Sequence, residues 1–105
     1  MKHITSRDNP LIKALRRLAQ DSTAYRKSGR IWLEGDHLCR AALTRGVRPV
    51  QAVFAQSWWD RCAQDWADVA PEMYVVADAV FDTLSQLESP ARMGFVMTLP
   101  SDPRM

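Results

Sequence analysis

The feature that most restricts the fold is the alternation of short apolar runs with segments of helical periodicity. Four runs, at residues 31–33, 49–55, 73–77 and 93–99, are short, apolar and rich in β-branched and aromatic side chains. Between them, apolar residues recur at three- and four-residue spacing, as they do in amphipathic helices. This alternation predicts an α/β fold, a small three-layer α/β/α sandwich with a mainly parallel four-stranded sheet.

The first predicted helix occupies residues 9–20. Asn9 is a favourable N-cap, and Pro10 suits the first helical position because its missing N–H has no partner there. The predicted buried stripe consists of Leu11, Ile12, Leu15, Leu18 and Ala19. The opposite face carries Lys13, Arg16, Arg17 and Gln20. A short basic turn or helix is expected over 21–28, started by Asp21 or Ser22 and ended by Gly29.

Three further helices follow the first three strands. Asp36, Ser57 and Asp78 are their predicted caps, and Gly46 is the predicted stop of the first of them. The predicted inward positions, in chain order, are Leu38, Cys39, Ala42, Leu43, Trp58, Trp59, Cys62, Ala63, Trp66, Val80, Phe81 and Leu84.

Length and composition indicate one globular domain. The chain has 105 residues, of which 47% are hydrophobic and 25% charged, which is too apolar for intrinsic disorder. No run approaches the roughly 18 apolar residues of a membrane span, and the N-terminus lacks the apolar region of a signal peptide. We therefore expect a cytoplasmic protein. Cys39 and Cys62 lack the paired spacing of a zinc site and are expected to be free thiols.

The charges are unevenly distributed along the chain. Residues 1–48 hold eleven Lys and Arg against four Asp and Glu, whereas residues 49–105 hold three against eight. An ordinary solvated helix face would explain one basic helix. The basic run also extends beyond the helix to Arg7, Arg26, Lys27 and Arg30, with few acids between, which favours contact with a polyanion. Lysine and arginine would neutralise phosphates there, and arginine can also stack on an unpaired base.

Catalytic motifs are not found. The sequence lacks G-x-G-x-x-G, G-x-x-x-x-G-K-[ST], H-E-x-x-H and G-x-S-x-G. The nearest reactive cluster is Glu34, Asp36 and His37, at the carboxyl end of a predicted strand, where α/β folds place their sites. A helix cap and an exposed histidine explain these residues more simply than a small-molecule enzyme does. A different class of function, protein interaction or dimerisation, would use the helix of Trp58, Trp59 and Trp66.

Two stretches carry a resemblance to a known family. They are ITSRDNPLIKALRRL, from Ile4 to Leu18, and YRKSGRIWLEGDHLCRAAL, from Tyr25 to Leu43. This order of motifs resembles the N-terminal substrate-binding domain of SpoU-type (TrmH-like) RNA 2′-O-ribose methyltransferases. The positions that fill the family pattern are Ser6, Asn9, Pro10, Lys13, Arg26, Gly29, Glu34 and Gly35. The later Thr-Pro-Gln-Gly turn of the family is altered here, because Ser89 replaces the Thr and three residues separate Pro90 from Gly94.

The resemblance implies a fold like that of the kink-turn-binding ribosomal proteins. It also implies a role in holding structured RNA, ribosomal or transfer RNA, for methylation by a following trefoil-knotted domain that uses S-adenosylmethionine. Residues 1–99 would be the RNA-binding domain and 100–105 the start of a linker to that domain. The chain alone would have no cofactor and no methyltransferase activity. Its expected partners are RNA, the catalytic domain and, through the parent protein, a second copy. The candidate RNA contacts are Arg7, Asn9, Lys13, Arg16, Arg17, Arg26, Lys27 and Arg30.

Overall fold

A computed structural model describes residues 2–20, 29–84 and 92–98 of the chain. The strands are β1 (Lys2–Ile4), β2 (Arg30–Glu34), β3 (Gln51–Ala55), β4 (Glu72–Val76) and β5 (Met93–Thr98). The helices are α1 (Pro10–Gln20), α3 (Asp36–Thr44), α4 (Gln56–Trp66) and α5 (Asp78–Asp82). The four predicted strands and the helices between them are confirmed. The short basic turn expected over 21–28 lies outside the described residues.

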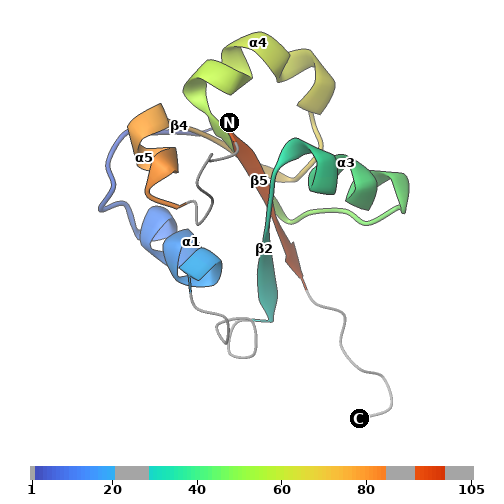
Figure 1. The fold of residues 1–105 in the computed structure, drawn as a ribbon, viewed down its shortest axis with the longest axis horizontal. Coiled ribbons are helices and arrows are strands. Elements are labelled where there is room, and N and C mark those ends of the chain that lie inside the picture. The colour runs from blue at the N-terminus through green and yellow to red at the C-terminus, as the bar shows by residue number, and fades with distance from the viewer. Residues whose placement is uncertain (1, 21–28, 85–91, 99–105) are drawn as a thin grey trace.

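The elements form three layers, as predicted. On one face of the sheet, α1 and α5 cover Val53, Val76 and Val96. On the other face, α3 and α4 cover Phe54 and Phe95 (Figure 1). Side chains of β3 are therefore buried on both faces, as its continuous apolar sequence requires.

The sheet differs from the prediction in both strand number and strand direction. It has five strands in the order β1-β4-β3-β5-β2. The strand that the sequence did not reveal, β1, has three residues and only one buried side chain, Ile4, so it carries no clear apolar pattern. β4 is parallel to β1 and β3, whereas β5 is antiparallel to β3 and β2, so the sheet is mixed rather than mainly parallel.

The direction of each strand follows from the edge of the sheet at which it begins. The eleven residues of α4 extend about 16 Å, enough to return the chain to the amino end of the sheet, and β4 is therefore parallel to β3. α5 has only five residues and extends about 7 Å. β5 begins at the carboxyl ends of its neighbours, where the backbone N–H of Gly35 donates to the Met93 carbonyl over 3.0 Å. β5 consequently runs antiparallel.

Two of the predicted helix ends are confirmed. The backbone N–H of Leu11 donates to Oδ1 of Asn9 over 2.8 Å, which is the expected N-cap bond of α1. Gly46 has a φ of 82° after the end of α3. Its N–H donates to the Leu43 carbonyl, and the next N–H, of Val47, donates to the Ala42 carbonyl, which completes a Schellman motif.

The three predicted acidic or hydroxyl caps are wrong. The N-caps of α3, α4 and α5 are Gly35, Ala55 and Ala77, and none makes a side-chain capping bond. Asp78 instead caps a different helix, because its Oδ1 accepts the backbone N–H of Ser57, near the start of α4, over 3.0 Å. The predicted buried position Leu38 is also wrong, since its side chain is 55% exposed on the outer side of α3.

Candidate nucleic-acid interface

The outward side of α1 is cationic. Ile12 and Leu15 are buried against the sheet, and the helical repeat then leaves Lys13, Ala14 and Arg17 exposed. Lys13 and Arg17 are four residues apart and therefore neighbours on the helix surface. Within the described residues, neither side chain forms an ion pair. Both charges are therefore available to an external anion.

Arg16 has a different position from its two basic neighbours. Its Nη2 donates to the Arg7 carbonyl over 3.2 Å and to Oγ1 of Thr83, after α5, over 3.0 Å. Its Nε is buried and has no hydrogen-bond partner among the residues that the structure describes. The side chain therefore joins α1 to the preceding loop and to the end of α5, rather than projecting into solvent like Arg17.

The remaining basic candidates lie at the two ends of α1. Arg7 is exposed in the loop before the helix, where the N–H of Asn9 donates to the Ser6 carbonyl over 3.2 Å. Arg30 is exposed at the start of β2, beyond the other end of the helix. Arg26 and Lys27 lie outside the described residues. The structure thus leaves Lys13 and Arg17 exposed on α1, Arg7 exposed before it and Arg30 exposed at the start of β2, and it assigns Asn9 to capping.

A polar cluster near Arg30 was not found by sequence reasoning. Oε1 of Glu72 accepts the Tyr74 hydroxyl over 2.6 Å and the amide Nε2 of Gln51 over 3.2 Å. These two hydrogen bonds are the main reason why the pKa of Glu72 is lowered, with smaller contributions from the positive charges of Arg30 and Lys2. The cluster leaves Gln51 as a buried polar side chain on a central strand. The sequence signal that could have revealed this cluster is the glutamine within an otherwise apolar strand.

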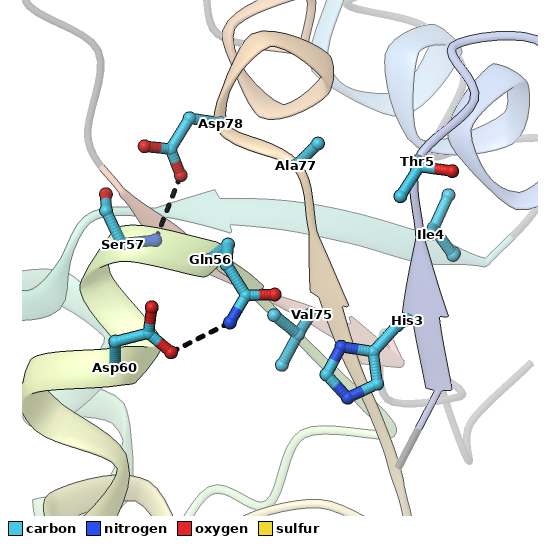
Figure 2. A pocket seen from close by; sticks show the side chains of 9 residues that line it. All are labelled: His3, Ile4, Thr5, Gln56, Ser57, Asp60, Val75, Ala77 and Asp78. Carbon is cyan, nitrogen blue, oxygen red and sulfur yellow. Dashed lines mark hydrogen bonds between the residues drawn. The ribbon is translucent and has the colours of Figure 1, made fainter.

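A groove was also missed, at the carboxyl ends of β1, β3 and β4. It has a volume of about 440 Å³ and is lined by His3, Ile4, Thr5, Gln56, Ser57, Asp60, Val75, Ala77 and Asp78. Figure 2 shows side chains from β1, α4 and the end of β4 around this space. We call it the edge-strand groove. Sequence reasoning missed it because β1, which supplies His3, was not predicted.

Asp78 lies at one end of this groove, and its carboxylate already accepts hydrogen bonds from Ser57. Hydrogen bonds from the backbone and side chain of Ser57 lower the pKa of this carboxyl, and the positive charges of Arg92 and Arg61 lower it further. The carboxylate therefore stays ionised at neutral pH and supplies the N-cap oxygen that α4 lacks in its own sequence.

The tryptophan helix belongs to the core. Trp66 is 1% exposed and packs edge-on against Phe95, with ring centroids 5.8 Å apart. Trp59 lies 4.9 Å from the ring of Phe54, and Trp58 is partly buried against both core clusters. The large exposed apolar side chains of the described residues are Leu38 and Val47. The structure therefore gives the alternative interaction function no exposed tryptophan patch.

The acidic cluster after β2 has structural partners. Oε1 of Glu34 accepts the indole N–H of Trp32 over 3.2 Å, and Asp36 lies in the first turn of α3. His37 is exposed. Among the described residues, no group of three or more His, Cys, Asp and Glu could hold a metal ion. The two cysteines are free thiols, as predicted, and burial raises the pKa of Cys39 to about 12.

None of the helices in the described part of the chain is both long and apolar enough to cross a membrane.

Comparisons with known proteins agree on one family. A family model for the MRM3-like substrate binding domain matches residues 9–94. An uncharacterized tRNA/rRNA methyltransferase of Synechocystis sp. is 31% identical over 102 residues, which are 94% of this chain and 36% of that protein. The chain thus spans about a third of the length of this relative.

Solved structures show the same fold. A crystal structure of an RNA 2′-O ribose methyltransferase matches 98% of this chain and 40% of its own, with a TM-score of 0.80 and 27% identity. An rRNA methyltransferase from Sinorhizobium meliloti matches 95% of this chain and 38% of its own, with a TM-score of 0.72 and 20% identity. The same enzyme with AdoMet bound gives a TM-score of 0.72 at 21% identity. Since the matching family model covers most of the chain, this protein belongs to the MRM3-like substrate binding domain family.

Proposed function

We propose that the domain holds structured RNA, ribosomal or transfer RNA, for 2′-O-ribose methylation by a catalytic domain elsewhere in the parent protein. The observation that carries the proposal is the exposed cationic side of α1, where Lys13 and Arg17 form no ion pair within the described residues. The names of the relatives, an RNA 2′-O ribose methyltransferase and a tRNA/rRNA methyltransferase, support RNA as the substrate.

In this proposal the work is divided between two parts of one enzyme. Residues 1–99 bind RNA, and residues 100–105, of which the structure describes none, begin the connection to a knotted domain. That domain would supply S-adenosylmethionine and the catalytic groups. The AdoMet-bound structure of the similarly folded rRNA methyltransferase is consistent with this cofactor.

The expected mode of binding is phosphate neutralisation. Arg7, Lys13, Arg17 and Arg30 would contact the RNA backbone, as would Arg26 and Lys27 between α1 and β2. Each neutralised phosphate releases counterions, so affinity must fall as salt is added. The acidic residues Asp65, near the end of α4, and Asp68, just after it, would disfavour RNA contact at that end of the helix.

A binding titration tests the proposal. We expect a fluorescently labelled RNA stem-loop to bind with an affinity that falls steadily as the salt concentration rises from about 50 to about 200 mM. Replacing both Lys13 and Arg17 by Ala should weaken binding about tenfold and reduce the slope of log affinity against log salt by about 1 to 2.

The matched control is the pair Arg45→Ala with Arg48→Ala, which removes the same charge from exposed positions beyond the far end of α3. This pair should change the affinity less than twofold. Equal losses in the two double variants, or no salt dependence in the original protein, would show that α1 is not the RNA-binding side.

A further inference from the structure

The edge-strand groove exists because none of the helices described, α1, α3, α4 and α5, covers one side of β1. Residues alternate along a strand, so Ile4 points into the core beneath α1 and α5 while His3 points to the other face. On that face α4 lies over β3 and β4, and β1 is beyond its reach at the edge of the sheet. His3, whose strand partner is Val75, therefore forms one wall of an open groove, and α4 forms the opposite wall.

The lining combines an apolar floor with hydrogen-bonding walls. Val75 and Ala77 form part of the floor, and the imidazole ring of His3 stands at one side. On the α4 side, Nε2 of Gln56 donates to Oδ1 of Asp60 over 2.8 Å (Figure 2). Oδ2 of Asp60 accepts no hydrogen bond from the described residues, and Oε1 of Gln56 is likewise without a donor among them. The wall thus offers two unused acceptor oxygens, beside the second N–H of the Gln56 amide.

These properties restrict the ligand. Asp60 and Asp78 would repel a phosphate group, and the described residues contain no metal-binding group. A volume of about 440 Å³ lies within the range, roughly 300–1,000 Å³, of sites that hold small organic groups. A flat ring with hydrogen-bond donors on its edge fits best, because it can stack on His3, cover Val75 and donate to Asp60.

We propose that the edge-strand groove binds an unpaired guanine of the RNA; this inference rests on the proposed RNA-binding function. Guanine presents two adjacent donors, N1–H and N2–H, which match the unused Oδ2 of Asp60 and the second lone pair of its Oδ1, the atom that already accepts from Gln56. Uracil presents one N–H between two carbonyl oxygens, which would face the Asp60 carboxylate unfavourably. Selection between bases by such edge contacts is typical of RNA recognition at unpaired nucleotides.

The groove also lies next to the loop that precedes α1. Thr5 lines the groove, and Arg7 follows two residues later in the loop that leads into α1. An RNA strand with a phosphate at Arg7 would therefore have a neighbouring base within reach of the groove. In this arrangement the positive side chains contact the RNA backbone, and the acceptor oxygens on α4 contact the base.

The test measures base preference separately from affinity. The probes are four labelled stem-loops with one stem and a six-nucleotide loop, either all uridine or uridine with one guanine, adenine or cytosine. We expect the guanine loop to bind about fivefold to tenfold more tightly than the uridine loop at the same salt concentration. Asp60→Asn should reduce this ratio to below about twofold and leave binding of the uridine loop nearly unchanged.

Asp68→Asn is the matched control, because it removes the same charge from an exposed residue outside the groove, and asparagine also tolerates the φ of 58° found there. It should preserve the ratio of the affinities for the guanine and uridine loops.

Lys13→Ala with Arg17→Ala should weaken binding of both loops equally. A failure of the RNA-binding proposal can therefore be distinguished from a failure of the groove proposal. No guanine preference in the original protein, or the same preference after Asp60→Asn, overturns the groove proposal. His3→Ala should weaken the guanine loop while circular dichroism shows the fold intact.

Discussion

The guanidinium of Arg16 connects three segments that are distant in sequence. It donates to the backbone of Arg7 and to the hydroxyl of Thr83, which in turn donates to the Val80 carbonyl over 2.7 Å. Sequence periodicity placed Arg16 beside Arg17 on the polar side of α1, and this was correct for the helix. It could not show that α5 lies against that side, because the contact spans 67 positions.

Arg16→Ala should therefore reduce stability more than RNA binding. Losing hydrogen bonds from a charged, partly buried group is expected to lower the free energy of unfolding by about 1 kcal/mol. The exposed Arg17→Ala should change it by less than about 0.5 kcal/mol and weaken RNA binding more. Urea denaturation and RNA titration of both variants check this. The reverse ranking in both measurements would place Arg16, and not Arg17, on the RNA-binding surface.

Individual residues were predictable where their partners are local. Asn9 and Gly46 act within four residues of their own positions, and both were identified from sequence. The prediction that Asp78 caps α5 was wrong, because its Oδ1 accepts the backbone N–H of Ser57 at the start of α4. This partner depends on the pairing of β3 with β4, which brings the starts of α4 and α5 together.

At the scale of elements, the cap from Asp78 links the start of α5 to the start of α4. Removing it by Asp78→Ala should lower the free energy of unfolding by about 1 kcal/mol at pH 7. The pKa of Asp78 is lower in the folded protein than its ordinary value of 3.8. Stabilisation by the charged cap is therefore fully present above that value and disappears as the pH falls through the lower, folded-state pKa.

The difference in stability between the original protein and Asp78→Ala should accordingly be constant from pH 5 to 7 and shrink below about pH 4. Urea denaturation at several pH values measures it. Asp78→Asn, which keeps an acceptor oxygen but cannot ionise, is the control and should lose less than Asp78→Ala at pH 7. A difference that grows on acidification would contradict the capping role.

Elements with a buried apolar run were predictable, and elements without one were not. The runs in β3 and β5 contain ten buried residues between them, so their identity as strands was clear. β1 contributes one buried residue and depends on pairing with β4. Strand direction was missed because it depends on the edge of the sheet at which each strand begins, and the apolar pattern of the sequence does not show this.

At the scale of the whole molecule, the two core clusters share one sheet. Leu15 lies in the cluster beneath α1 and α5, and Cys39 lies in the cluster on the other face. Because β3 and β5 contribute side chains to both, the two layers should unfold together. The fully buried thiol of Cys39 reports on one layer directly, since burial raises its pKa to about 12 and protects it from alkylation.

In a Cys62→Ser background, Cys39 should become reactive at the same urea concentration at which circular dichroism is lost. Leu15→Ala, in the opposite layer, should lower the free energy of unfolding by about 2 to 5 kcal/mol. It should shift the urea midpoint of Cys39 reactivity and the urea midpoint of circular dichroism equally. A thiol midpoint that does not move with Leu15→Ala would show that the layers unfold independently. Thr44→Ala, an exposed change on α3, should shift neither midpoint appreciably.

The position of β5 has a consequence for synthesis of the protein. β5 is the last strand in sequence but lies between β3 and β2, so β2 has no strand partner until residues 93–98 are available. During translation, β3 would expose an apolar edge until this final strand leaves the ribosome. The domain should therefore become resistant to protease on the ribosome only after Thr98 has emerged, in a single late step rather than by gradual growth from the N-terminus.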